Sequence, residues 1–422
     1  MLDLKYIRNN VEKVKHAIAL KNDKADVDKL IELDSKKRNI LIEVEDLKHQ
    51  RNKVSEEIGN MKKQKQDASD VIAKMREVSD KIKKLDENVK TYDEQIYYIH
   101  IRIPNIPHPS VPEGKDESAN VEVKRCGKLP EMDFQPEAHW EVGEKLGIID
   151  LAGGSKVSGS FFINYVGLGA RLQRALIFFM LDLHIKKHGY TEVYPPYIVN
   201  RESMFSTAQL PKMEEDMYHV AVDDLFLIPT AEVPVTNLLR DQLLKGENLP
   251  IYYTAYTPCF RREAGTHGKD TRGLIRVHQF DKVEMVKFVK PETSYDELEK
   301  LLGNAEEVLQ LLELPYRVLT LATGDLSFAA AKCYDIEVWA AGIGKWLEVS
   351  SCSNFEDFQA RRANIRFKPD PSSKPEYVHT LNGSGLALPR TVIAILENYQ
   401  TDEGTIIVPE VLREFMGTDV IK

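Results

Sequence analysis

Two runs of apolar residues with heptad spacing constrain the fold of this 422-residue chain more strongly than any other feature. Between Leu33 and Met61 the apolar residues recur three and four positions apart, if Lys37 and Arg51 are counted in the same row. A second run, over residues 71–99, keeps this alternation without a break. Such spacing places apolar side chains along one stripe of an α-helix. The sequence therefore predicts two long helices, each with a stripe that needs a partner.

The segment between the two runs, residues 62–70, is polar and contains Ser69, a residue type suited to the N-cap of a new helix. Two helices joined by so short a connection bury their apolar stripes by folding back on each other. We therefore expect an antiparallel coiled-coil arm over residues 30–100, roughly 50 Å long.

Charge does not by itself assign a role to this arm, because residues 31–100 contain 15 basic and 15 acidic side chains. Five basic side chains nevertheless gather near the turn: Lys62, Lys63, Lys65, Lys74 and Arg76. A cationic tip on a rigid stalk could bind phosphates, which makes these five residues candidate phosphate contacts. A dimerisation rod or spacer with ordinary solvated lysines explains the same pattern. Both alternatives remain open on these residues alone.

Three prolines in the segment Ile103-Pro-Asn-Ile-Pro-His-Pro end the helical pattern. We place a domain boundary there, with an N-terminal domain of residues 1–104 and a second domain of residues 105–422. In the second domain a helix is predicted over 168–187, followed by Gly189 and a short extended segment.

The rest of the second domain mixes strands and helices. Two β-rich runs, 251–262 and 274–289, flank a loop of glycines and charged residues, which predicts a long antiparallel hairpin. Further strands are expected at 225–228 and 346–351, and the last helix is expected from Pro389 to about Tyr399. The fold class is therefore α+β, with an antiparallel sheet flanked by helices.

Several classes of protein are disfavoured. The net charge of −9 argues against a protein that coats polyanions by bulk charge. The four cysteines form no CxxC pair, so neither a structural zinc nor a disulfide framework is expected, and a reducing cytoplasm suits the chain. The N-terminus has no signal pattern, and the longest apolar run is too short for a bilayer. Neither GxxxxGK[ST] nor a GxGxxG after a strand is present, so any phosphate must be bound by arginines and a metal.

The predicted hairpin carries the strongest candidates for such chemistry. Since alternate residues of a strand share a face, Arg261 and Glu263 point the same way, as do Phe280, Lys282 and Glu284 on the second strand. Such a face could hold a phosphate, a base and an amine together. Cross-strand ion pairs on a solvated sheet are the simpler explanation for any one pair, but a poor one for the whole set.

Residues 260–284 resemble motif 2 of the class II aminoacyl-tRNA synthetases in their seryl form, of bacterial type. His188-Gly-Tyr-Thr-Glu-Val-Tyr-Pro-Pro196 resembles motif 1, and Leu381-Asn-Gly-Ser-Gly-Leu-Ala-Leu-Pro-Arg390 resembles motif 3. Thr230-Ala-Glu232 is similar to the TAE signature of the seryl enzymes, and Glu348-Val-Ser-Ser351 to their metal and ATP segment. The resemblance includes the coiled-coil arm and nearly all of the chain.

The resemblance implies ATP as a substrate and Mg²⁺ as a cofactor. It implies that Arg261 binds the α-phosphate of ATP, Phe280 stacks on adenine and Arg390 completes the nucleotide site. It also implies that Glu348 and Ser351 hold the magnesium ion. The full set of implied catalytic and ATP-binding residues is Arg261, Arg262, Glu263, Phe280, Glu348, Val349, Ser350, Ser351 and Arg390.

For the amino acid, the resemblance implies a serine pocket. Its implied residues are Thr230, Ala231, Glu232, Glu284 and Ser384. Read alone, Ser384 could equally be a loop serine between two glycines. A pocket that hydrogen-bonds a hydroxyl rejects alanine strongly, because the missing hydroxyl leaves buried polar groups unpaired.

The family resemblance further implies a homodimer, with motif 1 at its interface. It implies transfer of the seryl group to the 3′-terminal ribose of serine tRNA, and of selenocysteine tRNA where that RNA is present. The arm would then bind tRNA. Two departures from the family pattern, Arg262 and Lys269, lie at the edge of the ATP hairpin and leave its exact contacts open.

Two rival functions are compatible with the same fold. The first is an amino acid ligase that loads a carrier protein instead of tRNA, which the intact arm disfavours. The second is a catalytically silent RNA-binding paralogue. The joint presence of the arginines and carboxylates of the implied site disfavours that reading.

Overall fold

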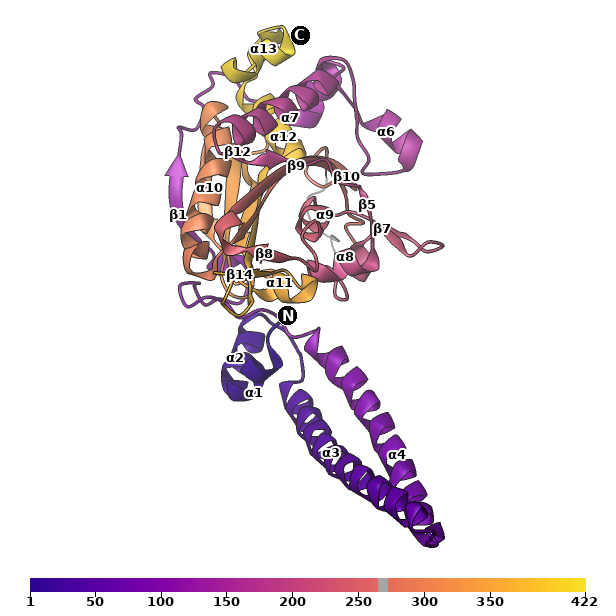
Figure 1. The fold of residues 1–422 in the computed structure, drawn as a ribbon. Helices are drawn as coiled ribbons and strands as arrows, with labels where there is room; N and C mark the ends of the chain where they lie inside the picture. Colours follow the sequence, from indigo (N-terminus) through magenta and orange to yellow (C-terminus); the bar gives the residue numbers. More distant parts are fainter. Residues whose placement is uncertain (265–271) are drawn as a thin grey trace. The chain divides into compact units, whose positions relative to one another are not determined.

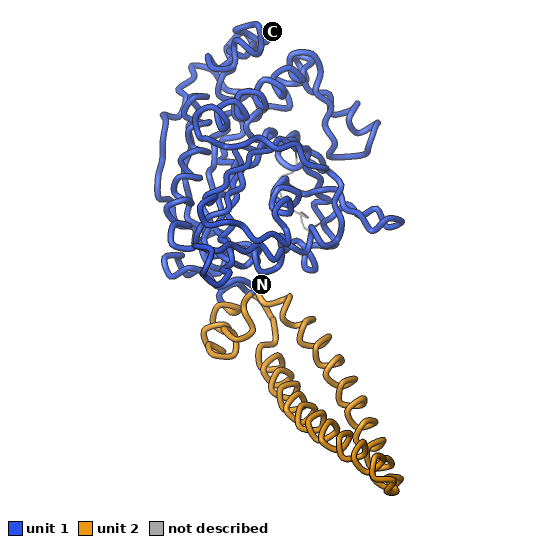
Figure 2. Tube along the Cα trace, in the orientation of Figure 1, with its two compact units in different colours: residues 1, 20–22, 104–422 blue, residues 2–19, 23–103 orange. Residues whose placement is uncertain are grey.

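The computed structural model describes residues 1–264 and 272–422, which form two compact units (Figure 2). One unit comprises residues 2–19 and 23–103, and the other comprises residues 1, 20–22 and 104–422. The sequence boundary after residue 104 lies beside this division. The functions assigned to the two domains stay predictions.

The first unit is helical and contains a long antiparallel helix pair (Figure 1). Two short helices, α1 (Leu4–Asn9) and α2 (Val11–Leu20), precede α3 (Val27–Lys63) and α4 (Ser69–His100). In α3 and α4 the seam residues are buried or half-buried, as Val44 and Ile82 illustrate, whereas most residues between them are exposed. The heptad pattern therefore correctly predicted the coiled-coil arm.

The turn of the arm differs in one detail from the prediction. Ser69 is the first helical residue of α4 and not its N-cap, which is Ala68 and has no side-chain cap bond. Instead, Asp67 accepts hydrogen bonds from the backbone N–H and the hydroxyl of Ser69 at 2.9 and 2.6 Å. A carboxylate two residues upstream is the stronger acceptor, so it satisfies the free N–H group there. The five basic residues near the turn are all exposed.

The second unit is built on an eight-stranded sheet with the order β1-β11-β12-β13-β16-β10-β9-β4. All pairings in it are antiparallel except that of β4 with β9. The strands are β1 (Val121–Cys126), β4 (Thr191–Glu192), β9 (Ile251–Phe260), β10 (Gln279–Val289), β11 (Tyr316–Thr320), β12 (Lys332–Ala340), β13 (Lys345–Asn354) and β16 (His379–Ala387). This architecture confirms the predicted α+β class.

Strand β10 shows how the sheet divides core from site. Its residues Val283, Met285 and Val289 pack into the main apolar core, with α7 (Leu168–Lys186), α10 (Ser294–Leu311) and α12 (Leu388–Asn398). Its residues Val286 and Phe288 face a second cluster on the opposite side. Because successive side chains alternate, Phe280, Lys282 and Glu284 also lie on that opposite side.

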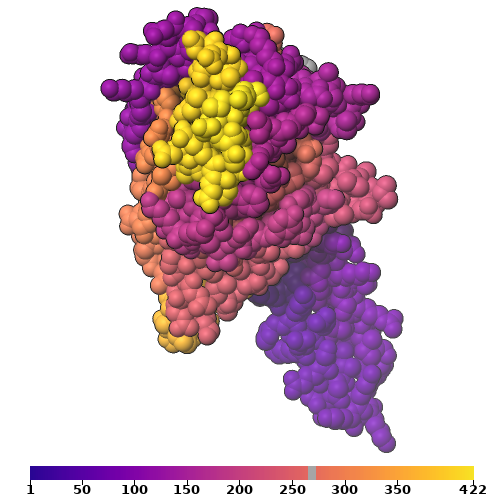
Figure 3. Space-filling model, turned by 90° about the horizontal axis from the view of Figure 1, so that it is seen from above, coloured from indigo at the N-terminus to yellow at the C-terminus, as the bar shows by residue number. Residues whose placement is uncertain are grey.

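Shorter elements complete the unit. The helices are α5 (His139–Lys145), α6 (Leu151–Ser158), α8 (Arg201–Ser206), α9 (Glu232–Asn237), α11 (Phe358–Ala363) and α13 (Arg413–Met416). The strands are β2 (Ile149–Asp150), β3 (Asn164–Tyr165), β5 (Ile198–Asn200), β6 (His219–Val220), β7 (Leu225–Leu227), β8 (Leu243–Lys245), β14 (Arg366–Lys368), β15 (Glu376–Tyr377), β17 (Ile406–Ile407) and β18 (Val420–Ile421). Figure 3 shows the C-terminal segment, in yellow, beside the purple residues that include α7, where Arg171 donates to the carbonyl of Phe415 at 3.2 Å.

Two sequence predictions about this unit were wrong in detail. Strand β10 begins at Gln279 and not at residue 274, because the N–H of Leu274 donates to a ring nitrogen of His139 at 3.0 Å instead of joining the ladder. The helix over 388–398 is not the last one, since α13 follows it. No helix in the described part of the chain is long and apolar enough to cross a membrane.

Candidate active site

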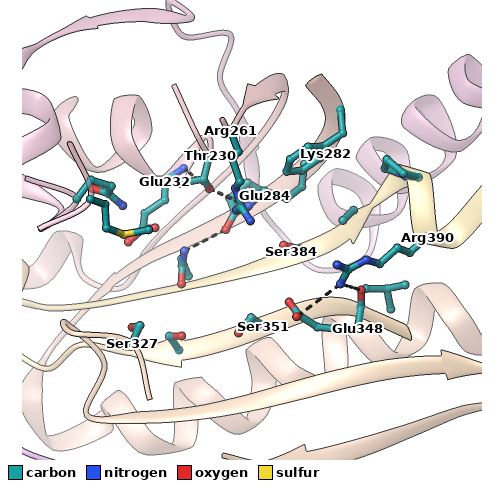
Figure 4. A pocket seen from close by; sticks show the side chains of 18 of the residues that line it. Thr230, Glu232, Arg261, Lys282, Glu284, Ser327, Glu348, Ser351, Ser384 and Arg390 are labelled. Carbon is teal, nitrogen blue, oxygen red and sulfur yellow. Dashed lines mark hydrogen bonds and ion pairs between the residues drawn. The ribbon is translucent and has the colours of Figure 1, made fainter. Parts of the chain in front are cut away.

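A cavity of about 370 Å³ opens on the face of the sheet formed by β10, β13 and β16 (Figure 4). Most of the residues singled out in the sequence line it. They are Thr230, Glu232, Arg261, Glu263, Phe280, Glu284, Glu348, Val349, Ser351, Ser384 and Arg390. These residues come from segments up to 160 positions apart in the chain, yet they share one space.

Three predicted residues do not line the cavity. Arg262 is exposed, and it donates from its guanidinium to the carbonyl of Glu215 at 3.0 Å. Ala231 is buried in the second apolar cluster. Ser350 is buried and donates to the carbonyl of Ser384 at 2.6 Å, so it supports the neighbouring strand. Arg262 lies two residues beyond the end of β9, where its backbone N–H donates to the carbonyl of Asp216 at 2.9 Å. Lys269 lies outside the described residues.

The two phosphate-binding candidates line different parts of the cavity, Arg261 near Glu284 and Arg390 near Glu348 (Figure 4). The guanidinium of Arg261 lies 5.2 Å from the centre of the Phe280 ring, and its Nε donates to the carbonyl of Pro229 at 3.3 Å. Arg390, in the first turn of α12, donates to the backbone carbonyl of Glu348 at 2.8 Å. None of the described residues bonds to the outer nitrogens of Arg261, so these nitrogens can face an anion.

Glu348 and Ser351 face the same cavity because β13 is bulged. They are three positions apart, so a regular strand would point them to opposite faces. The pairing of β12 with β13 shifts between Ile336 and Glu337, which leaves Val349 as an extra residue. A bulge of this kind reverses the alternation. Figure 4 shows both side chains directed into the cavity.

The opposite wall holds a buried charge network around Glu284. Lys282 Nζ lies 2.7 Å from Glu284 Oε2 and donates to Thr230 Oγ1 at 2.8 Å. The other oxygen of Glu284 accepts from Asn382 Nδ2 at 3.1 Å. Ser384 pairs directly across the sheet with Glu284. Each charge is compensated, as a buried ion pair requires.

Glu232 differs from Glu284 in forming no ion pair with the described residues, although the positive charges of Lys282 and Arg261 lower its pKa somewhat. It is buried, and Oε1 accepts from Gln359 Nε2 at 2.5 Å. Burial raises the pKa of Glu232 to about 7, while the bond from Gln359 opposes that rise and the nearby Glu284 adds to it. A carboxyl group held this way is ready to receive a cationic ligand.

Sequence reasoning missed several residues of this cavity. Lys282 was placed on the correct face but not in the site, and Asn382 lies within the motif 3 segment without having been chosen. Arg276 lines the cavity and donates to Glu263 at 2.9 Å. Gln359 lies 127 positions from its partner Glu232, and no local pattern in the sequence indicates that contact.

The sheet, the three motifs and the cavity together define a class II aminoacyl-tRNA synthetase. The model for "tRNA synthetase class II core domain (G, H, P, S and T)" matches residues 216–399. The model for "Seryl-tRNA synthetase N-terminal domain" matches residues 1–107.

Relatives narrow the class to one family. The chain is 59% identical to the serine–tRNA ligase of Carboxydothermus hydrogenoformans over 100% of its own length and 99% of the relative's, and 58% identical to that of Thermoanaerobacter pseudethanolicus over 100% of both. The crystal structure of seryl-tRNA synthetase from Pyrococcus horikoshii complexed with ATP is 42% identical, with a TM-score of 0.95 and coverage of 100% and 99%. The chain belongs to the seryl-tRNA synthetases, the serine–tRNA ligases.

Proposed function

We propose that this enzyme activates L-serine with ATP to give seryl-adenylate and pyrophosphate, and then transfers serine to the 3′-terminal ribose of serine tRNA. The observation that carries the proposal is the cavity that collects Arg261, Glu284, Glu348 and Arg390 around one space. Cationic side chains and a compensated carboxylate along its walls suit a nucleotide beside an amino acid.

For the nucleotide, Arg261 binds the α-phosphate and Phe280 stacks on adenine, with Glu263 on the adenine side. Arg390 completes the nucleotide site. The serine carboxylate displaces pyrophosphate at the α-phosphorus, forming the new P–O bond as the old one breaks. The carboxylate arrives ionised, so no general base is needed, and the protein aligns the two anions and offsets the developing charge.

A magnesium ion fits the residues at Glu348 and Ser351. The Ser351 hydroxyl donates a hydrogen bond to Asp335 at 2.6 Å, and the thiol of Cys333 lies 3.1 Å from the same oxygen. A hydroxyl oxygen has two lone pairs, so one stays available to a cation. Mg²⁺ usually takes one or two protein oxygens and completes its shell with phosphates and water. When bound, it would polarise the phosphate oxygens.

For serine, Glu232 receives the ammonium group, while Glu284, Thr230 and Ser384 surround the hydroxyl. Lys282 already compensates Glu284, which leaves Glu232 as the carboxyl group that gains a partner when serine enters. Threonine must be excluded by lack of room for its methyl group, a more modest discrimination than that against alanine.

Serine binding should depend on pH through Glu232. Below pH 7 its carboxyl is mostly protonated because burial raises its pKa to about 7, so binding the ammonium group must release a proton. The dissociation constant of serine should therefore fall about tenfold between pH 6 and pH 8. Calorimetric titration at several pH values measures this change. Glu232→Gln should bind weakly and without that slope, and an equal slope in the variant would exclude Glu232 as the cause.

We propose that the helical arm binds tRNA through its exposed basic residues, Lys62, Lys63, Lys65, Lys74 and Arg76. Scattered lysines suit contacts with the phosphate backbone, which read RNA shape more than base sequence.

Selenocysteine tRNA is a further candidate acceptor. We place the enzyme in the cytoplasm.

We propose a homodimer with motif 1 at its interface. Phe178 on α7 and Tyr194 after β4 are 52% and 76% exposed, which is unusual for large aromatic side chains unless another surface covers them. Sedimentation equilibrium should give about twice the 48.2 kDa chain mass. Phe178→Glu should shift the enzyme towards the chain mass, and a wild-type enzyme at the chain mass would contradict the dimer.

The direct test of the proposed function is pyrophosphate–ATP exchange with each of the twenty amino acids. Serine should support exchange, threonine should support it weakly, and alanine should be rejected. Charging of serine tRNA by the same enzyme then separates tRNA ligation from the loading of a carrier protein. Exchange with no amino acid would support the catalytically silent alternative.

A further inference from the structure

The strand that carries Ser384 is bulged immediately after that residue. Across the sheet, Glu284 pairs with Ser384 while Lys282 pairs with Ala387, so Val283 faces two residues of β16, Gly385 and Leu386. An extra residue in a ladder leaves backbone groups without strand partners. Buried backbone groups of this kind need other hydrogen-bond partners.

Helix α7 supplies these partners. His184 Nε2 lies 2.9 Å from the carbonyl oxygen of Gly385, and the N–H of Leu386 donates to Met180 Sδ at 3.0 Å. On the other side, Ser350 donates to the carbonyl of Ser384 at 2.6 Å. The backbone next to Ser384 is therefore held from two directions.

The contact between α7 and the bulge is close enough to require glycine. A Cβ at position 385 would lie 2.3 Å from His184 Nε2, far inside van der Waals contact. Both His184 and the strand here are buried, so neither group can turn to water for a partner. The contact with His184 therefore requires glycine at position 385.

The hydrogen-bond chemistry fixes the proton positions. A carbonyl only accepts, so His184 donates from Nε2, and burial lowers its pKa to about 4, which keeps the ring neutral. Its Nδ1 must then accept from Nδ1 of His188, 2.9 Å away. His188 Nε2 lies 2.8 Å from a carboxylate oxygen of Glu307, which also accepts. The three side chains therefore form one continuous hydrogen-bonded row.

We propose that the row Glu307–His188–His184 is a positioning element for the serine pocket: it fixes the Gly385–Leu386 bulge and thereby the direction of the Ser384 side chain. The proposal rests on the proposed role of Ser384 in binding serine. It assigns His184 and His188 an effect on amino acid binding, although neither lines the cavity. If the row had only a structural role, breaking it would lower the stability of the enzyme and would affect serine binding and ATP binding to the same extent.

The test compares His184→Leu with His184→Gln in serine-dependent pyrophosphate exchange. Leucine keeps much of the volume and removes the hydrogen bond, whereas the glutamine amide can donate from the position of Nε2. His184→Leu should raise the KM for serine about tenfold with the KM for ATP within about twofold, and His184→Gln should recover to within about threefold of wild type. The proposal would be overturned if the KM values for serine and ATP rose together, which is the result that dimer dissociation would give. It would also be overturned if His184→Gln showed no recovery.

A second pair of variants covers the case in which His184→Leu does not fold. His188→Leu breaks the row at its outer histidine and should also raise the KM for serine selectively. Lys187→Ala is the matched control, because the Lys187 side chain pairs with Glu307 and, within the described part of the chain, forms no hydrogen bond with either histidine. It should leave both KM values unchanged. A normal serine KM in His188→Leu would refute the proposal.

Ser384→Ala distinguishes the role of Ser384 in serine binding from the role of the row Glu307–His188–His184 in positioning it. If it raises the KM for serine while the His184 and His188 variants do not, the serine pocket stands and the positioning row fails. If Ser384→Ala has no effect, the proposed role of Ser384 itself fails.

Discussion

Replacing Arg261 by alanine is expected to lower serine-dependent pyrophosphate exchange by about 10³-fold while the enzyme stays folded. Arg261 lies on the cavity wall beside Phe280, and its side chain makes one bond to the protein, from Nε to a backbone carbonyl, among those described here. Removing it takes away the charge that faces the α-phosphate without leaving a buried partner ion unpaired. Exchange kinetics and the thermal unfolding midpoint measure the two parts of this prediction.

Arg262 provides the matched comparison for that variant. It is the adjacent arginine, but its guanidinium bonds to the carbonyl of Glu215 outside the cavity. Arg262→Ala should therefore change exchange by less than about threefold. Near-normal exchange in Arg261→Ala, or an equal loss in both variants, would mean that the phosphate site has been assigned to the wrong residues.

Shortening the arm should separate the two half-reactions. Lys37 and Asp93 form an ion pair between α3 and α4, so residues 38–92 can be replaced by a short glycine-rich turn that joins neighbouring helical turns. Pyrophosphate exchange should stay within about twofold of wild type, because the described cavity residues all lie beyond residue 200. Aminoacylation should fall by at least about 10²-fold, because the shortened enzyme lacks the proposed surface that contacts the phosphate backbone of tRNA.

A charge variant makes the arm experiment more specific. Changing the five basic residues near the turn to glutamine keeps the coiled coil but removes the cations. It should weaken tRNA binding and flatten its dependence on salt concentration, measured by filter binding at several ionic strengths. If the shortened enzyme charged serine tRNA normally, the arm would be only a spacer.

The sequence predicted well those features in which residues of one kind recur at a regular spacing. Heptad spacing between Leu33 and Met61 predicted the arm because a helix of any length repeats the same geometry. The hairpin of β9 and β10 followed from two β-rich runs, and alternation placed Lys282 beside Glu284 on one face.

The features that the sequence did not predict depend on breaks in such periods. Strict alternation puts Glu348 and Ser351 on opposite faces, and only the extra residue Val349 in β13 brings them together. Arg262 was included through the motif resemblance, but it lies beyond the end of β9 and its guanidinium bonds to the carbonyl of Glu215 instead. The contact of Gln359 with Glu232 depends on how α11 packs against α9, which no local pattern encodes.

The central claim is that Arg261, Phe280 and Arg390 hold ATP beside the serine pocket in one cavity. A crystal structure of the enzyme with serine, Mg²⁺ and a non-hydrolysable ATP analogue measures this directly. We expect the α-phosphate at Arg261, adenine on the Phe280 ring, the metal at Glu348 and Ser351, and the serine ammonium at Glu232. A nucleotide bound elsewhere, with these side chains left in contact with solvent, would contradict it.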